Sequence, residues 1–166
     1  MLHQQNNTIC DATIEISAGS NIKYEMKEDG RLYVDRITPH AYPFCYGYVE
    51  QTTSPDGDCL DVVVVSEHAF RPQCVVSGRV VGVIDMDDEE GYDPKLILVP
   101  VFEHEQDHIL NISDLVPDTM DRIVTFFDSY KLHDRRRWSK VTGVRSAADA
   151  VELLGACRDR FQKKEA

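Results

Sequence analysis

The sequence has few basic residues, no paired-cysteine motif and no long apolar run. Its 18 Lys and Arg residues are outnumbered by 29 Asp and Glu residues, which gives a formal charge of -11. Such a chain repels a phosphate backbone, so general nucleic-acid binding is not expected. No segment approaches the roughly 20 apolar residues of a membrane span, and the N-terminal residues Met1–Asn7 contain no apolar stretch. These absences predict a soluble, cytoplasmic protein with no membrane partner.

Disulfide staples and zinc knuckles are also not expected. The chain has five cysteines, an odd number, and none of them forms a C-x-x-C pair. With 166 residues, of which 42% are hydrophobic, the chain is long enough to bury a core. Because no repeat, low-complexity segment or Pro/Gly/Ser-rich linker divides it, we predict a single domain over residues 1–166.

The first two-thirds of the chain read as short strands, and the last third reads as helices. Several strands are continuous β-branched runs, as in Val62–Val65, and Gly or Pro separates the strands. The expected strands are Thr13–Ser17, Lys23–Met26, Leu32–Val34, Tyr46–Gln51, Val62–Val65, Val75–Ile84 and Leu96–Val101. Many short strands favour a closed barrel.

Two helices are expected after the strands. Apolar residues recur at helical spacing over Asp118–Lys131, and a second helix begins after Ser146 as its N-cap. Val151, Leu154 and Phe161 are expected on the apolar side of the second helix. The predicted fold class is therefore α+β.

The most informative local feature is the acidic run Asp56-x-Asp58-x-x-Asp61 between a turn and a strand. Gly57 allows a tight bend, so the three carboxylates can converge on one small volume. Carboxylates held so close together repel, and a hard divalent cation with oxygen ligands relieves that repulsion. A solvated acidic turn is the alternative interpretation of this run taken alone.

A second acidic run, residues 85–93, connects two expected strands and could complete a shared metal site. Taken alone, a run of this kind is more often a solvated loop. Neither run fits a calcium-binding EF-hand loop, because the sixth position holds Glu90 in one and Asp61 in the other where Gly is required. Both runs are also flanked by strands rather than by helices.

His104-Glu105-Gln106-Asp107-His108 formally matches the H-E-x-x-H pattern of zinc proteases. Pro100 lies close upstream, and the extended histidine version of the motif fails at Asn111 and Asp114. We therefore interpret this segment as a surface helical turn.

Four basic residues lie near acidic or aromatic residues at the ends of expected elements. They are Lys23, Arg36, Lys95 and Lys131. Each one alone is compatible with a solvated surface charge. Together with the carboxylates they could hold an anion that also binds metals, which describes a polyphosphate.

With these residues assembled, the sequence resembles the family I soluble inorganic pyrophosphatases of the short, bacterial type over nearly its whole length. The resemblance rests on eight ordered motifs. They are Ile14-Glu15-Ile16, Lys23-Tyr24-Glu25, Val34-Asp35-Arg36, Tyr42 to Tyr48, Asp56 to Asp61, Gly82 to Glu89, Asp93-Pro94-Lys95 and Phe126-Phe127-x-x-Tyr130-Lys131.

The resemblance implies a fold, an activity and a cofactor. The fold is a small, OB-like β-barrel of five strands with about two helices packed outside, the main ones C-terminal. The activity is hydrolysis of pyrophosphate to two phosphates, with several Mg²⁺ ions in the site and with Mn²⁺ or Zn²⁺ as substitutes. A homo-oligomer, and a hexamer in particular, is expected by the same analogy.

The resemblance also assigns roles to individual residues. Asp58 is the expected general base. The expected metal ligands are Asp56, Asp61, Asp88, Asp93 and Glu15. The expected phosphate contacts are Lys23, Arg36, Tyr46, Lys95, Tyr130 and Lys131, and the other expected active-site residues are Glu25, Tyr42 and Glu89.

The chain departs from the family pattern at two motif positions. Cys59 replaces the usual proline of the acidic motif, and Cys45 replaces the usual asparagine before Tyr46. We expect these thiols to lie beside charged ligands and to make the protein sensitive to thiol reagents. Two other functions stay open on the residues alone, namely a cation-binding barrel without catalysis and another metal-dependent phosphohydrolase.

Overall fold

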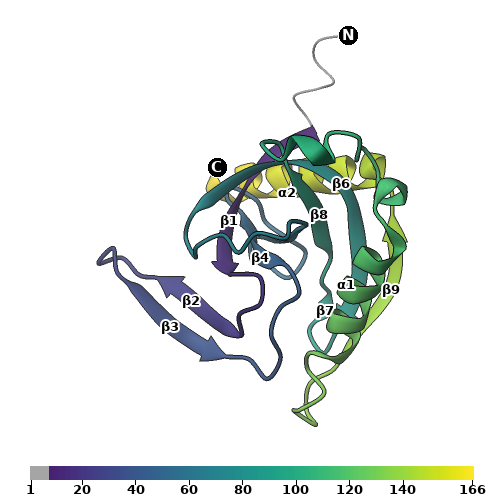
Figure 1. Ribbon diagram of the computed structural model, residues 1–166. Coiled ribbons are helices and arrows are strands. Elements are labelled where there is room, and N and C mark those ends of the chain that lie inside the picture. Colours follow the sequence, from purple (N-terminus) through teal and green to yellow (C-terminus); the bar gives the residue numbers. More distant parts are fainter. Residues whose placement is uncertain (1–7) are drawn as a thin grey trace.

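The computed structural model describes residues 8–166, so the N-terminal segment Met1–Asn7 discussed above lies outside the described residues. Figure 1 shows a curved sheet with one helix along each side and a separate two-stranded hairpin. The strands are β1 (Ile9–Ile16), β2 (Ile22–Met26), β3 (Leu32–Ile37), β4 (Cys45–Val49), β5 (Leu60–Val64), β6 (Val75–Asp88), β7 (Gly91–Tyr92), β8 (Lys95–Pro100) and β9 (Ser139–Arg145). The helices are the short 3-10 turns η2 (His104–Gln106) and η3 (Ile112–Asp114), and the α-helices α1 (Pro117–Ser129) and α2 (Ala147–Glu165).

Five of the strands close into a barrel. Their order is β1-β4-β5-β8-β6, and β6 pairs again with β1. All these pairings are antiparallel except that of β5 with β8, which is parallel. The predicted α+β architecture, a five-stranded barrel with two helices outside, is confirmed. Closure leaves no free edge among these five strands.

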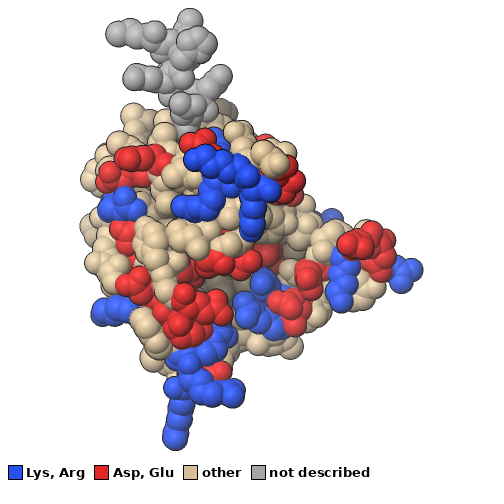
Figure 2. Space-filling view, turned by 180° about the vertical axis from the view of Figure 1, so that it is seen from behind, with Lys and Arg blue, Asp and Glu red and all other residues tan. Residues whose placement is uncertain are grey.

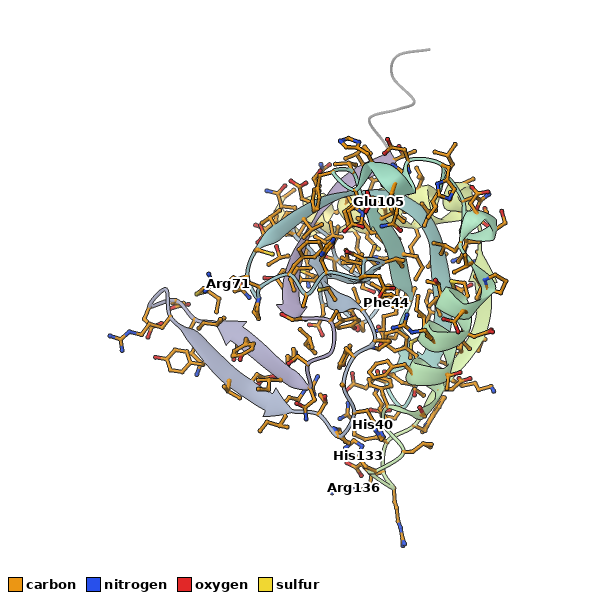
Figure 3. All side chains as sticks on the ribbon, in the orientation of Figure 1. His40, Phe44, Arg71, Glu105, His133 and Arg136 are labelled. Atoms are coloured by element: carbon orange, nitrogen blue, oxygen red, sulfur yellow. The ribbon has the colours of Figure 1, made fainter. Side chains whose placement is uncertain are left out.

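The β5 and β8 strands are buried on both faces, as their apolar runs predicted. Leu60, Val62 and Val64 of β5 pack in one hydrophobic cluster, which also receives residues of α2. Val63, the residue between them, belongs to a second cluster with α1. Because side chains alternate along a strand, the two faces of β5 belong to different clusters, one that includes residues of α2 and one that includes residues of α1. Phe44 shows the depth of the second cluster, since it lies in the interior in Figure 3 while Arg136 extends away from the protein.

One glycine is required where two barrel strands approach each other. A Cβ atom on Gly47 of β4 would lie 1.9 Å from the backbone oxygen of Thr13 on β1. No side chain fits there. Gly47 therefore allows β4 to pack closely on β1, and its neighbours Tyr46 and Tyr48 both line the cavity described below.

The two α-helices match the expected positions, and Leu154 is buried on the second as expected. The α1 helix starts at Pro117, a favourable first position, and buries Thr119 and two phenylalanines near its end. Ser146 caps α2 by accepting a hydrogen bond from the backbone N–H of Asp149, as predicted. The buried residues of α2 are Ala150, Leu154 and Cys157, whereas Val151 and Phe161 are half-buried.

Several strand boundaries differ from the expectation, and the strands β7 and β9 were not expected. The β6 strand runs through the acidic residues to Asp88, because Asp87 and Asp88 pair with β7 and with β9. The β4 strand ends at Val49, since Gln51 has a positive φ of 56°. The β9 strand was not predicted, because it alternates between exposed and half-buried positions and has no apolar run.

The β2–β3 hairpin is a separate two-stranded sheet that projects from the barrel (Figure 1). All six residues of β3 are exposed. The hairpin thus adds little to the core. Instead it forms one wall of the cavity described in the next subsection. Among residues 8–166, no helix has the length and apolar character needed to cross a membrane.

Candidate active site

A cavity of about 720 Å³ opens between the β2–β3 hairpin and the barrel. In Figure 2, acidic and basic side chains meet around this hollow, next to the projecting hairpin. The lining residues come from both sheets, from the Asp56–Asp61 loop and from the segment that follows α1. Side chains far apart in the sequence are therefore brought to one place.

Nearly every residue singled out from the sequence lines this cavity. The acidic members are Glu15, Glu25, Asp56, Asp58, Asp61, Asp88 and Asp93. The basic and aromatic members are Lys23, Arg36, Lys95, Lys131, Tyr42, Tyr46 and Tyr130. Glu89 is the exception. It does not line the cavity, but it accepts a hydrogen bond from Nζ of Lys131, which does.

The acidic loop is an exposed turn held by backbone hydrogen bonds. Gly57 has a φ of +96°, and its N–H donates to the carbonyl of Ser54. The N–H of Ser54 donates to the carbonyl of Asp58, and the N–H of Asp58 donates to a carboxylate oxygen of Asp56. Asp56 and Asp58 are both exposed. Their carboxylates are therefore open to solvent at the cavity mouth.

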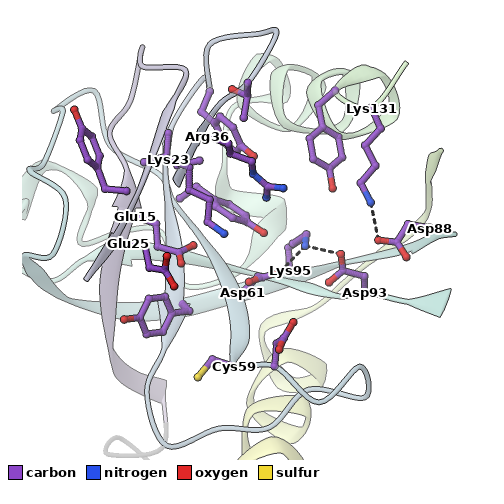
Figure 4. Close-up of a pocket in the computed structure, with 18 of the residues that line it drawn as sticks. Glu15, Lys23, Glu25, Arg36, Cys59, Asp61, Asp88, Asp93, Lys95 and Lys131 are labelled. Carbon is purple, nitrogen blue, oxygen red and sulfur yellow. Dashed lines mark hydrogen bonds and ion pairs between the residues drawn. The ribbon is translucent and has the colours of Figure 1, made fainter. Parts of the chain in front are cut away.

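Lys95 joins two of the carboxylates deep in the cavity. Its Nζ lies 2.6 Å from Asp61 Oδ2 and 2.8 Å from Asp93 Oδ2 (Figure 4). The parallel register of β5 and β8 places Asp61 directly opposite Lys95. Lys95 is only 1% exposed, so these ion pairs are shielded from water at the lysine end.

The charges around Lys95 do not balance. Burial raises the pKa of Asp93 to about 6; Lys95 lowers it in part, and Asp61 raises it again. Burial disfavours the ammonium of Lys95, but Asp61 and Asp93 outweigh burial and raise the pKa of Lys95. One ammonium neutralises only one of two carboxylates. The local deficit of positive charge suits an additional cation with a preference for oxygen ligands.

Lys131 makes a second buried ion pair. Its Nζ lies 2.9 Å from Asp88 Oδ2 and 3.2 Å from Glu89 Oε1. Glu89 also accepts a hydrogen bond from Arg137. Burial alone would raise the pKa of Glu89, but its own backbone N–H and the Arg137 guanidinium lower it to about 2. Glu89 is thus a fixed negative charge that holds Lys131 and Arg137 together.

The hairpin contributes cations to the opposite wall of the cavity. Figure 4 shows Lys23 and Arg36 extending from the hairpin toward Lys95. Strict alternation along a strand would place the consecutive residues Lys23 and Tyr24 on opposite sides, yet both line the cavity. The pairing of β2 with β3 shifts register between these two residues, which leaves Asp35 as an extra residue on β3.

The remaining predicted residues surround the charged groups. Burial raises the pKa of Glu15; Lys23 opposes this shift, and Asp61 adds to it. Burial also raises the pKa of Tyr42 to about 12 and, together with Asp61, raises that of Tyr46. Burial likewise raises the pKa of Tyr130. The three phenols are therefore neutral hydrogen-bond donors at neutral pH.

The predicted convergence of Asp56, Asp58 and Asp61 on one small volume is not seen. Within residues 8–166, no group of three or more His, Cys, Asp or Glu side chains is arranged to hold a metal ion. Asp61 is turned to Lys95, and Asp56 accepts from the backbone of its own turn. The three aspartates nevertheless line the same cavity.

Comparisons with known proteins identify the relatives of this chain. A family model described as inorganic pyrophosphatase matches residues 12–162. The chain is 42% identical over 161 residues to the inorganic pyrophosphatase of Helicobacter pylori (strain ATCC 700392 / 26695), covering 94% of this chain and 92% of that one. The chain belongs to the inorganic pyrophosphatase family.

Solved structures agree with this assignment. A crystal structure of the inorganic pyrophosphatase from Thermus thermophilus matches with a TM-score of 0.89 at 38% identity, covering 93% of this chain and 92% of that one. A Helicobacter pylori pyrophosphatase structure matches with a TM-score of 0.87 at 39% identity, covering 94% of this chain and 95% of that one.

Membership of the pyrophosphatase family implies a divalent metal cofactor, and the donors of this cavity fit one. Hard divalent cations take carboxylate oxygens as ligands. Asp61 and Asp93 share a single ammonium, and burial of Asp93 works against leaving its charge unpaired. We therefore regard the carboxylates of the cavity as compatible with the cofactor that the family implies.

The two unusual cysteines of this pyrophosphatase lie in different environments. Cys59 lines the cavity, but burial and the adjacent Asp58 raise the pKa of its thiol. Cys45 is fully buried, and its Sγ accepts a hydrogen bond from the backbone N–H of Ala18. The expectation that both thiols lie beside charged ligands was therefore wrong for Cys45. Cys59 is the one of the two that a thiol reagent can reach.

The H-E-x-x-H segment is unrelated to the cavity. His104 to Gln106 form the surface turn η2, as expected, and His104 pairs with Asp107 at 3.3 Å. The side chain of His104 is 83% exposed. Neither residue lines the cavity.

Some lining residues were not singled out from the sequence. His133 and Arg137 line the cavity and belong to the segment after α1, where Arg135, Arg136 and Arg137 follow one another. This basic run in an otherwise acidic chain was the available signal. Tyr48, in contrast, was part of a recognised motif but carried no assigned role.

Proposed function

We propose that this protein hydrolyses inorganic pyrophosphate to two orthophosphates by attack of a water molecule, with Mg²⁺ as its metal and with Mn²⁺ or Zn²⁺ able to substitute. The observation that carries the proposal is the mixed lining of the cavity. Carboxylates that suit divalent cations stand beside four cations, Lys23, Arg36, Lys95 and Lys131. A site of this kind suits a polyanion that arrives together with metal ions.

The expected metal ligands carry over from the family by position. Asp56, Asp61 and Asp93 would form the tightest site, and Asp61 would also contribute to a second one. Asp88 and Asp93 would hold an ion that arrives with the substrate, and Glu15 would contact a further ion. Bound metal ions would neutralise charge on the phosphates and lower the pKa of the attacking water.

Asp58 is the proposed general base. It is exposed at the cavity mouth, and no basic side chain is paired with it in the described residues. Its carboxylate would accept the proton of the attacking water as the new P–O bond forms and the bridging P–O bond breaks. A carboxylate is a sufficient base for a water whose pKa has been lowered.

The cations and phenols are the proposed phosphate contacts. Arg36 is a two-pronged donor, whereas Lys23, Lys95 and Lys131 act as point charges, so the set can hold several oxygens at different angles. Tyr46 and Tyr130 stay protonated because burial raises the pKa of each phenol. Each can therefore donate a hydrogen bond to a phosphate oxygen. Glu25, Tyr42 and Glu89 support these groups as neighbours.

The proposal is tested by measuring phosphate release from pyrophosphate, a nucleoside triphosphate and a phosphomonoester, each with Mg²⁺ and with a chelator. We expect Mg²⁺-dependent turnover of pyrophosphate and far slower turnover of the other two. A preference for the nucleotide or the monoester would indicate a different phosphohydrolase. Metal binding without any turnover would indicate a cation-binding module.

We further propose that residues 1–166 act as one pyrophosphatase domain in the cytoplasm and that the chain assembles as a homo-oligomer, with a hexamer favoured by the family resemblance. Exposed apolar residues outside the cavity, such as Leu110, Val116 and Leu132, support burial in an assembly. Light scattering coupled to size-exclusion chromatography measures the mass directly. A monomeric mass at micromolar concentration would contradict the assembly.

A further inference from the structure

The β6–β7 hairpin carries two of the proposed metal ligands on a very short ladder. Asp88 is the last residue of β6, and Asp93 follows directly after β7. Only two residue pairs join the strands, Asp87 with Tyr92 and Asp88 with Gly91. The backbone N–H of Asp93 adds one hydrogen bond to the carbonyl of Met86. So short a hairpin is not rigid by itself.

Three side chains outside the cavity, those of Asp85, Tyr92 and Arg145, connect the strands of this hairpin by hydrogen bonds. Arg145 holds Asp85 with two hydrogen bonds, from Nε to Oδ2 at 2.5 Å and from Nη2 to Oδ1 at 2.9 Å. Nη2 of Arg145 also donates to the hydroxyl of Tyr92 at 3.1 Å. The Tyr92 hydroxyl in turn donates to Asp85 Oδ1 at 2.5 Å. The cluster thereby joins β9, β6 and β7 through side chains.

The cluster acts from the side of the hairpin that faces away from the site. Asp85, Tyr92 and Arg145 do not line the cavity, whereas Asp88 and Asp93 do. Tyr92 immediately precedes Asp93, so fixing its side chain limits where the backbone of Asp93 can move. Asp85 lies three residues before Asp88 on β6 and fixes the other arm. The cluster thus contacts both arms of the hairpin that carries the two carboxylates.

We propose that Arg145, Asp85 and Tyr92 are positioning residues that preset Asp88 and Asp93 for divalent-cation binding. The inference rests on the proposed function, because it concerns the ligands of that site. Arg145 is suited to this role because its planar guanidinium bonds both oxygens of one carboxylate while still reaching a third acceptor. Contacts that orient metal ligands commonly change metal affinity or activity by about 10–100-fold.

The test uses Tyr92→Phe and Arg145→Gln in the full chain. Tyr92→Phe removes one hydroxyl and keeps the ring, and Arg145→Gln removes the two-pronged contact. Glu67→Gln is the matched control, because Glu67 forms an ion pair with Arg122 at 3.6 Å and neither residue lines the cavity. Mg²⁺ binding is measured by calorimetry without substrate, and kcat and KM for pyrophosphate are measured over a range of Mg²⁺ concentrations.

We expect both cluster variants to bind Mg²⁺ about tenfold more weakly and to need about tenfold more Mg²⁺ for half-maximal turnover. Their kcat at saturating Mg²⁺ should stay within about twofold of the wild-type value, and the control should match wild type throughout. A merely structural role would instead lower Tm or kcat and leave the Mg²⁺ affinity unchanged.

Unchanged Mg²⁺ affinity in Tyr92→Phe overturns the inference, even if Arg145→Gln fails to fold. The calorimetric comparison separates this inference from the proposed function. If the wild-type chain releases no phosphate from pyrophosphate, the proposed function fails. The difference in Mg²⁺ affinity between the wild-type chain and Tyr92→Phe still decides the role of the cluster.

Discussion

The two sides of the cavity hold their carboxylates in different ways. On the strand side, Asp61, Asp88 and Asp93 are each paired with a lysine that is almost fully buried. On the loop side, Asp56 and Asp58 are exposed and lie on a turn held by backbone hydrogen bonds. Both sides face the same cavity, yet the carboxylates of one side are paired with buried lysines and those of the other are open to water.

This difference in burial and pairing suits the carboxylates of the two sides to different roles in the proposed reaction. Buried ion pairs fix the position of a carboxylate, because separating the partners leaves an unpaired charge. An exposed carboxylate without a lysine partner is free to accept and release a proton. The strand side is therefore suited to binding, whereas the exposed Asp58 on the loop side is suited to proton transfer, next to the proposed metal ligand Asp56. The following experiments test this division.

The largest effect is expected for Asp58→Asn on the loop side. The amide cannot accept a proton, so the rate of pyrophosphate hydrolysis should fall by about 10²–10⁴-fold. Because the amide keeps the shape of the side chain, Mg²⁺ binding measured by calorimetry should change little. A near-normal rate would show that Asp58 is not the base.

On the strand side, Lys95→Met should mainly lower stability. Removing the ammonium leaves Asp61 and Asp93 facing each other without compensation, and breaking a buried pair of this kind costs about 3–5 kcal/mol. Urea unfolding measures this loss. Added Mg²⁺ should restore more stability to the variant than it adds to the wild-type chain, since the cation replaces the missing charge. Equal stabilisation of both proteins by Mg²⁺ would contradict this account of the strand side.

A smaller effect is expected where α2 supports the acidic loop. Arg160 donates to the carbonyl of Thr53 at 2.7 Å, and the N–H of Thr53 donates to the carbonyl of Cys157. Losing the charged hydrogen bond in Arg160→Ala should cost about 1.5 kcal/mol of unfolding free energy. Amide exchange should accelerate in residues 52–58 more than in β5. The control is Lys163→Ala, which changes an exposed residue on the same helix. If both variants lose the same unfolding free energy and accelerate exchange equally, Arg160 does not specifically support the acidic loop.

The smallest effect concerns pH. Burial alone would raise the pKa of Asp85, but hydrogen bonds from Arg145 and Tyr92 lower it below the ordinary value. A lowered carboxyl pKa contributes stability above the unfolded value of about 3.9, and that contribution is lost as the pH falls through the folded value. The difference in urea midpoint between the wild-type chain and Asp85→Asn should thus be constant near neutral pH and shrink in acid. If the difference in urea midpoint does not change with pH, the ion pair between Asp85 and Arg145 does not contribute to stability as described.

Much of the fold followed from local patterns in the sequence, whereas the membership of the site followed from the resemblance to the pyrophosphatase family. The β-branched run at Val62–Val65 already indicated a strand buried on both faces, and Ser146 marked the start of α2. The β9 strand escaped prediction because its residues are half-exposed and are specified by pairing with β6. The acidic end of β6 was also not predicted, because it too is specified by pairing with neighbouring strands.

The contacts within the site could not be predicted, because they depend on how distant strands align. Lys95 was expected to contact phosphate, but its position between Asp61 and Asp93 follows from the parallel register of β5 and β8. The placement of both Lys23 and Tyr24 at the cavity follows from an irregularity in the hairpin. Neither feature has a signature within one segment.

The central claim is tested most directly by following pyrophosphate with phosphorus NMR in the presence of the wild-type chain. With Mg²⁺, the pyrophosphate signal should disappear and be replaced by orthophosphate alone, and a chelator added before the protein should stop the conversion. A pyrophosphate signal that persists with Mg²⁺ at catalytic protein concentration, while the protein is folded, would contradict the account.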